Sequence, residues 1–131
     1  MDLCTYDLHT GILKRQTHTS GSADEGQAWD EHSKFISDSP GDSVVLVSSS
    51  TGYHSGAPHE CDISDGSHMK WTKTDLYLFS ESAGDADMQR LTYFNEVGHP
   101  HYCNCTNALP SDLSWNGDAQ SAIVFYQQFV W

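Results

Sequence analysis

The sequence has few basic residues, few cysteines and no long hydrophobic run. Lys and Arg total 6 against 18 Asp and Glu, so the formal net charge is −12. Binders of nucleic acid or of anionic membranes need clustered Lys and Arg, so both partner classes are disfavoured. No apolar run reaches the length of a transmembrane helix, so no transmembrane helix is expected. The hydrophobic fraction of 37% predicts a thin core in a single domain of 131 residues.

The chain contains four cysteines, Cys4, Cys61, Cys103 and Cys105. An even, low number in a Ser/Gly/Asp-rich chain favours two disulfides and an oxidising compartment. Only one residue separates Cys103 from Cys105, which disfavours a bridge between them. Cys4 and Cys61 are then each expected to pair with one of these two, in either order. Four free, buried thiols are the alternative.

A second interpretation of the same region is a metal site. In the run HPHYCNC, His99, His101, Cys103 and Cys105 alternate, so a strand would point all four the same way. Zinc sites usually have longer gaps between chelating cysteines, which disfavours this interpretation.

Strand signals dominate the chain. Apolar or β-branched runs at residues 43–50, 75–80, 88–94 and 121–131 are separated by Gly, Pro, Asn and Asp, which predicts an all-β sandwich or barrel. The one helix candidate is 23–35, where acidic residues come early and a lysine comes late.

A weak internal repeat suggests two similar β units, about 1–51 and 74–131, joined by a Gly/Ser/His-rich connection at 52–67. Residues 2–11 read DLCTYDLHTG and residues 75–84 read DLYLFSESAG. In each half a Ser-Asp pair, a Gly-Asp pair and an apolar strand follow in the same order. Each unit alone is too small to bury its apolar face, so a shared core is expected.

The second half carries a family resemblance. Residues 109–113 read LPSDL and residues 116–124 read NGDAQSAIV. This pattern resembles the closing segment of the βγ-crystallin Greek key. The resemblance implies two Greek-key motifs in one sandwich. It also implies weak calcium binding at Asp118 and Ser121, since calcium needs oxygen ligands and the other family positions here lack them.

Secreted members of that fold include yeast killer toxins, antifungal proteins and metalloproteinase inhibitors, and the opening Leu3-Cys4-Thr5-Tyr6 is similar to the start of such chains. Met1 before Asp2 is interpreted as an initiator added to a mature secreted chain. The resemblance implies a non-catalytic extracellular protein. The acidic balance disfavours a killer-toxin attack on anionic surfaces.

The candidate ligand-binding residues are two aromatic residues, Trp115 and Tyr53, and two histidines, His54 and His59. Trp115 precedes an Asn-Gly turn signal and is expected to be exposed, where it would stack on a sugar ring. His59 and Glu60 supply the pair that a hydrolase or ribonuclease would need, but only Arg15 and Arg90 offer guanidinium groups for a phosphate.

The sequence therefore predicts a small secreted interaction protein of the toxin, antimicrobial or effector type, with no catalytic residue and no cofactor besides weakly held calcium. Its expected partner is an extracellular protein or a cell-surface glycan. The alternatives are a secreted proteinase inhibitor that presents the 52–67 connection, a calcium- or carbohydrate-binding module, and a His/Glu hydrolase.

Overall fold

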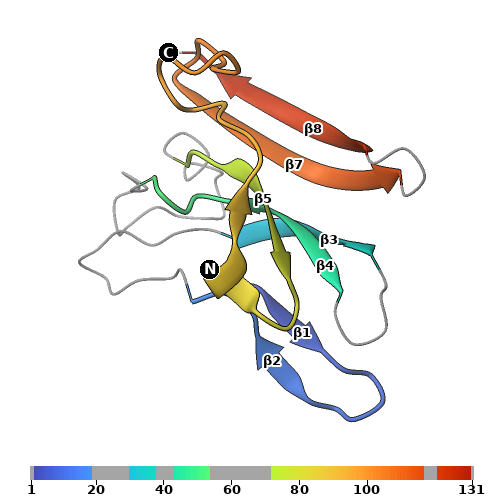
Figure 1. Ribbon diagram of the computed structural model, residues 1–131. Helices are drawn as coiled ribbons and strands as arrows, with labels where there is room; N and C mark the ends of the chain where they lie inside the picture. Colours follow the sequence, from blue (N-terminus) through green and yellow to red (C-terminus); the bar gives the residue numbers. More distant parts are fainter. Residues whose placement is uncertain (1, 19–29, 38–42, 54–71, 117–120, 131) are drawn as a thin grey trace, which may run out of the picture.

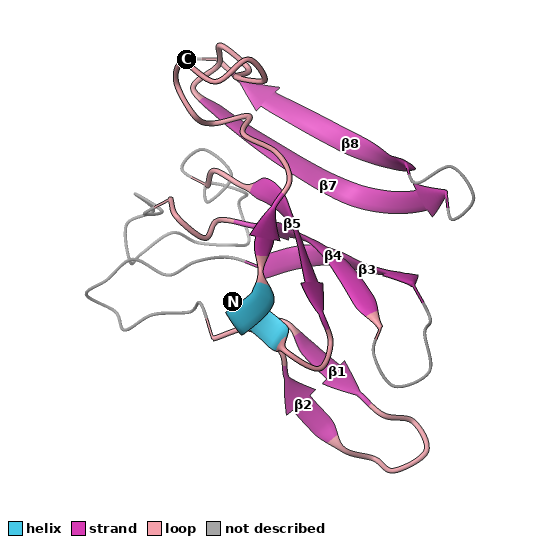
Figure 2. Cartoon of the chain, viewed as in Figure 1, coloured by secondary structure: helices cyan, strands magenta, loops and turns pink. Residues whose placement is uncertain are grey.

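The computed structural model describes residues 2–18, 30–37, 43–53, 72–116 and 121–130. Within these ranges it consists of β-strands and one short 3-10 helix, η3 (Gly84–Asp87), as Figure 2 shows. The strands are β1 (Cys4–Tyr6), β2 (Leu13–Arg15), β3 (Asp30–Ser37), β4 (Val44–Ser49), β5 (Asp75–Ser80), β6 (Gln89–Arg90), β7 (Asn107–Asn116) and β8 (Ser121–Phe129). The predicted all-β class is confirmed.

Three antiparallel sheets contain these strands, in the orders β1-β2, β3-β4-β5-β6 and β7-β8. Figure 1 shows the β7–β8 hairpin on one side of the four-stranded sheet and the β1–β2 hairpin on the other. Every pairing among the described strands joins neighbours in the sequence, which is a meander. The predicted Greek-key order is not confirmed.

The core is centred on β4 and β5. Val45, Val47, Tyr77 and Phe79 form one buried cluster, because alternate residues of paired strands share a face. Leu46 on the opposite face is also buried, and β7 packs against both strands. A strand buried on both faces reads as a continuous apolar run, as VVLV does here.

Three predicted strands are confirmed with small changes at their ends. The signals at 43–50, 75–80 and 121–131 correspond to β4, β5 and β8. The signal at 88–94 is a strand only in β6. Beyond it, the backbone N–H of Leu76 donates to Oγ1 of Thr92 at 2.9 Å rather than to a carbonyl, so a side chain ends the ladder.

The predicted helix at 23–35 is wrong where it can be checked. Residues 30–37 form β3, which pairs with β4 from Asp30 opposite Ser49 to Ser37 opposite Val44. Charges placed to suit a helix dipole are worth only about 0.3–1 kcal/mol. Pairing with a buried strand outweighs that local preference. Residues 23–29 lie outside the described part of the chain.

Two bulges bring β3 and β7 together. His32 has φ 52° where the register of β3 shifts, and Asp112 has φ 48° where that of β7 shifts. Their Nδ1 and Oδ1 atoms lie 3.5 Å apart. The Ser111-Asp112 pair thus lies at a kink within a strand.

The cysteines differ from expectation. Cys103 and Cys105 are bonded to each other, with Cα atoms 5.2 Å apart, although their spacing was expected to disfavour such a bridge. Asn104 between them has φ 52°, and this left-handed turn brings the two Cα atoms within bridging range. Cys4 is free and exposed. The two-disulfide framework is therefore wrong for three of the cysteines, and Cys61 lies outside the described residues.

Candidate functional site

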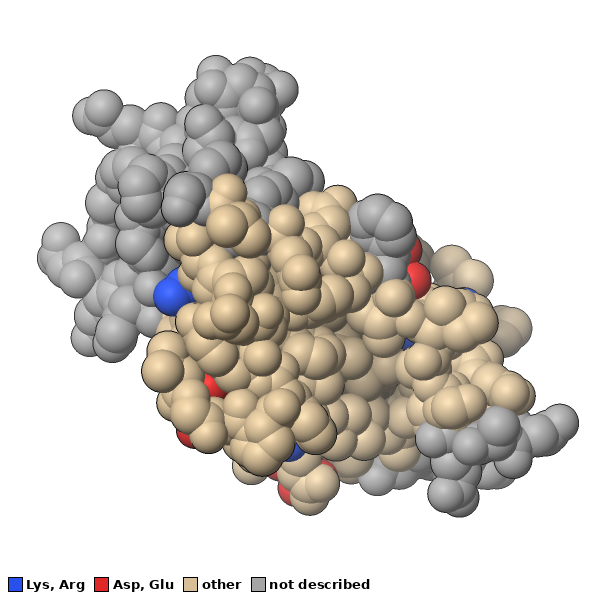
Figure 3. Space-filling view, turned by 90° about the horizontal axis from the view of Figure 1, so that it is seen from above, with Lys and Arg blue, Asp and Glu red and all other residues tan. Residues whose placement is uncertain are grey.

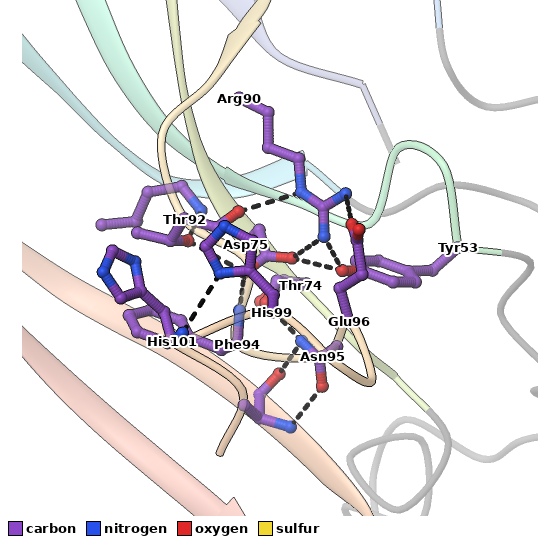
Figure 4. Close-up of polar contacts among 12 residues, drawn as sticks. Tyr53, Thr74, Asp75, Arg90, Thr92, Phe94, Asn95, Glu96, His99 and His101 are labelled. Carbon is purple, nitrogen blue, oxygen red and sulfur yellow. Dashed lines mark hydrogen bonds and ion pairs between the residues drawn. The ribbon is translucent and has the colours of Figure 1, made fainter. Parts of the chain in front are cut away.

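Asp75, the first residue of β5, is a fully buried carboxylate. Its Oδ2 accepts hydrogen bonds from the Tyr53 hydroxyl at 2.5 Å and from Nη2 of Arg90 at 2.8 Å. Its Oδ1 accepts from Oγ1 of Thr92 at 2.9 Å and from the backbone N–H of Phe94 at 2.8 Å. Figure 4 shows these donors converging on the carboxylate. Each carboxylate oxygen therefore accepts two hydrogen bonds, and Asp75 positions the groups that surround it.

Arg90 connects this carboxylate to the surface. Its Nε donates to the carbonyl of Thr92 at 2.9 Å, its Nη1 donates to Glu96 at 2.9 Å, and its Nη2 also donates to the Tyr53 hydroxyl. Burial disfavours the charged guanidinium, but the hydrogen bond and negative charge of Asp75 outweigh it and raise the pKa of Arg90. Burial and the hydrogen bond to Asp75 also raise the pKa of Tyr53.

Aromatic rings continue outward from Arg90. Its guanidinium carbon lies 5.0 Å from the ring centre of Tyr53 and 4.3 Å from that of Tyr93. Tyr93 stacks on His99 at 4.2 Å, and His99 meets His101 edge-on at 5.0 Å. Nδ1 of His99 accepts the backbone N–H of His101 at 3.1 Å, which places the proton of a neutral His99 on Nε2. These five residues are called the Arg90 stack below.

The loop 91–106 is fixed to the core by a buried amide. Asn95 donates through Nδ2 to the carbonyls of Thr74 at 2.8 Å and Ala108 at 3.1 Å. Its Oδ1 accepts the backbone N–H of Ala108 at 2.7 Å. Val97, in the same loop, is 80% exposed to solvent. The loop is therefore rigid and has an exposed apolar tip.

The β1–β2 hairpin carries the second candidate surface. Large apolar side chains gather there with at least half of their area exposed: Leu8 (88%), Leu13 (66%), Ile12 (62%), Tyr6 (59%) and, from β3, Phe35 (50%). We call this group the hairpin pole. Contiguous exposed apolar surface on a small protein marks a contact site for a partner.

A hollow of about 550 Å³ opens within the hairpin pole. Tyr6, Ile12 and Phe35 line it, and Asp7 and Glu81 add carboxylates. Asp7 accepts the backbone N–H groups of Thr10 at 3.0 Å and His9 at 2.7 Å, and these bonds lower the pKa of its carboxyl. The hollow is thus lined by large apolar residues together with two acidic residues and Lys14.

The opposite end of the molecule carries β7 and β8 (Figure 1). Figure 3, viewed onto the end that carries β7 and β8, shows mostly uncharged side chains with isolated acidic and basic groups. Ile123 of β8 is 75% exposed there. This residue offers a matched control for the hairpin pole.

The predicted ligand residues do not form one site. Tyr53 belongs to the Arg90 stack, whereas Trp115 is half-buried in β7 opposite Ala122. Ser121 is exposed at the start of β8. His54, His59 and Asp118 lie outside the described residues, as do Cys61 and residues 54–67 of the predicted connection.

Sequence reasoning missed Asp75 and the role of Arg90. Asp75 was read only as the start of an apolar strand, and Arg90 as one of two scarce guanidinium groups. The available signal was a carboxylate at the edge of a buried run, which needs a charged partner in the fold. Among the described residues, no three His, Cys, Asp or Glu side chains come together as a metal site.

No known family model matches this chain, and no curated protein or solved structure shows detectable similarity to it. In the part of the chain that the structure covers, no helix has the length and the apolarity needed to cross a bilayer.

Proposed function

We propose that this chain is a small secreted interaction protein that binds a basic, apolar segment of an extracellular protein through the hairpin pole, with no bond chemistry at that surface. The single observation that carries the proposal is the group of five exposed apolar side chains at the hairpin pole, of which Tyr6, Ile12 and Phe35 line one hollow. Full burial of one such side chain contributes about 1.5–3 kcal/mol, whereas micromolar affinity needs about 8.2 kcal/mol, so a partner segment must bury several side chains of the pole.

Charge selects the kind of segment. The chain has a formal net charge of −12, and Asp7 and Glu81 line the hollow. Lys14 lines it too, and its Nζ donates to the carbonyl of Glu81 at 2.6 Å. Two acidic residues and one lysine leave the lining with one net negative charge. A partner segment with an apolar side chain flanked by Lys or Arg therefore complements the hollow in shape and in charge.

Secretion is part of the proposal, and the Cys103–Cys105 bond supports it because disulfides persist in oxidising compartments. A toxin, antimicrobial or effector role fits a small protein that exposes an apolar pole. The βγ-crystallin resemblance and calcium binding at Asp118 and Ser121 stay predictions.

A second candidate, a secreted proteinase inhibitor, is favoured by the loop 91–106. Asn95 ties this loop to the core, while Val97 is exposed. Proteinase inhibitors present rigid loops of this kind to an active site. The connection at 52–67, expected from the sequence to act in this way, is not described beyond Tyr53.

The test is selection of peptides from a displayed library, followed by measurement of affinity with Tyr6→Asp and Ile12→Asp variants. We expect selected peptides to contain an apolar residue beside Lys or Arg, and each variant to weaken binding by about tenfold. Ile123→Asp, at an equally exposed site on β8, should leave affinity unchanged. If the hairpin variants bind as the wild type does, the proposal is wrong. Inhibition of a proteinase panel that Val97→Asp abolishes would favour the second candidate.

A further inference from the structure

The Cys103–Cys105 disulfide closes a ring around a single residue. That residue, Asn104, has φ 52°, a left-handed conformation that L-residues adopt at a cost. In the reduced chain nothing covalent holds Asn104 in this conformation. The bond therefore maintains a local backbone arrangement that reduction would release.

The two sulfur atoms have different surroundings. Cys105 is buried at 8% exposure, whereas Cys103 is half-buried and more accessible. The backbone N–H of Cys105 points at Sγ of Cys103, 3.2 Å away. A donor in that position stabilises negative charge on Cys103 when it becomes a thiolate.

The surrounding loop does not depend on the bond. The backbone N–H of Cys103 donates to the carbonyl of Phe94 at 2.9 Å, and that of Tyr102 donates to the carbonyl of His99 at 2.9 Å. Asn95 fixes the loop to the core separately. A bridge that closes so short a loop also adds little entropy-based stability. The bond is thus poorly suited to a structural role.

We propose that Cys103–Cys105 is a thiol–disulfide exchange site that oxidises accessible thiols. A substrate thiolate attacks Sγ of Cys103, the bond to Cys105 breaks, and Cys105 leaves as a thiolate that takes up a proton. A second substrate thiolate attacks the substrate sulfur of this mixed disulfide. It releases Cys103 as the thiolate that the Cys105 N–H stabilises. Two thiols become one disulfide, and the cysteine pair gains the two electrons.

The site lies on loop 91–106 and is independent of the hairpin pole. The experiment uses the full chain with Cys4→Ser and Cys61→Ser, equilibrated with reduced and oxidised glutathione, acid-quenched, alkylated and mapped by mass spectrometry. We expect millimolar reduced glutathione to open the pair. Mixed disulfide should form on Cys103 in preference to Cys105 by about tenfold, since access decides which sulfur is attacked.

Substitutions at Asn104 supply the matched controls. Asn104→Gly removes the cost of the left-handed turn and should lower the equilibrium constant for reduction by about threefold, and Asn104→Val should raise it by about tenfold. The proposal is overturned if the pair stays oxidised in excess reduced glutathione, or if glutathione attaches mainly to Cys105. It is equally overturned if peptide mapping of the wild type joins Cys103 or Cys105 to Cys4 or Cys61.

Discussion

The guanidinium of Arg90 and the carboxylate of Asp75 form a 2.8 Å ion pair in which the carboxylate is fully buried. The pair links the first residue of β5 to the last residue of β6. The same carboxylate binds Thr92 and Phe94 of the following loop. One side chain therefore fixes both the edge of the sheet and the start of the loop 91–106.

Asp75→Asn should lower the free energy of unfolding by about 3–5 kcal/mol, because a charge paired in the interior loses its partner. Urea unfolding followed by tryptophan fluorescence measures the change. Asp87→Asn, at an exposed position of η3, is the matched control and should change the value by less than about 0.5 kcal/mol. Equal effects of the two substitutions would contradict the structural role of Asp75.

Tyr77 makes stability depend on alkaline pH. Burial raises the pKa of Tyr77 from its usual 10.0 to about 12, against the opposing effect of the Arg90 charge. Between these values the unfolded chain releases the hydroxyl proton first, so rising pH favours unfolding. The contribution of Tyr77 is complete below pH 10 and declines as the pH approaches 12.

Urea unfolding from pH 8 to 11.5 should therefore show a falling free energy of unfolding that Tyr77→Phe makes shallower. That variant also loses the hydrogen bond to the carbonyl of Thr51, 2.6 Å long, so its stability is lower at pH 8. Tyr6→Phe, on the exposed hairpin, serves as the control and should keep the wild-type slope. An unchanged slope in Tyr77→Phe would count against the burial of its hydroxyl.

The strands that could be predicted are those whose burial on both faces gives a continuous apolar run in the sequence. The run VVLV of β4 and the run LYLF of β5 are apolar on both faces, so no tertiary knowledge was needed to find them. β3 was missed because its sequence DEHSKFIS has little β pattern, and its pairing with β4 arises only in the fold.

The candidate site was less predictable for a related reason. Tyr53 was found as an aromatic residue, but its contacts with Asp75 and Arg90 span 22 and 37 positions. The Cys103–Cys105 bond was rejected on spacing, and only the left-handed turn at Asn104 makes it possible. Neither relationship leaves a periodic signal in the sequence.

Gly84 lies where the backbone of η3 approaches the backbone of Gln16 closely. It has φ 62°, and an added Cβ would lie 2.5 Å from the carbonyl oxygen of Gln16. Gly84→Ala should therefore cost roughly 3 kcal/mol, since it combines a left-handed residue with a backbone clash. Gly98 has φ 91°, and no described atom lies within 4 Å of its added Cβ. Gly98→Ala should cost only about 1–2 kcal/mol.

Thermal unfolding of both glycine variants separates the two contributions. The difference between their melting temperatures reports the clash alone, because both variants bear the cost of a positive φ. Melting temperatures that agree within error would mean that η3 does not lie against Gln16.

Asn95 is the last residue for which the structure makes a sharp prediction. Asn95→Ala leaves the carbonyl of Thr74 and the N–H of Ala108 without the side chain that binds them. Each of these two orphaned groups costs about 1–3 kcal/mol, so we expect a loss of about 2–6 kcal/mol. Amide hydrogen exchange should accelerate throughout the loop 91–106. Asn116→Ala, at the exposed end of β7, should alter neither property.

Asn95→Asp distinguishes loss of the donor from loss of the side chain. The carboxylate keeps an acceptor for the N–H of Ala108, but its second oxygen faces the carbonyls of Thr74 and Ala108. Protonation restores a donor there, so this variant should regain stability relative to the wild type as the pH falls from 7 towards about 4. Loss of stability that is independent of pH in this range would show that the amide does not donate to these carbonyls.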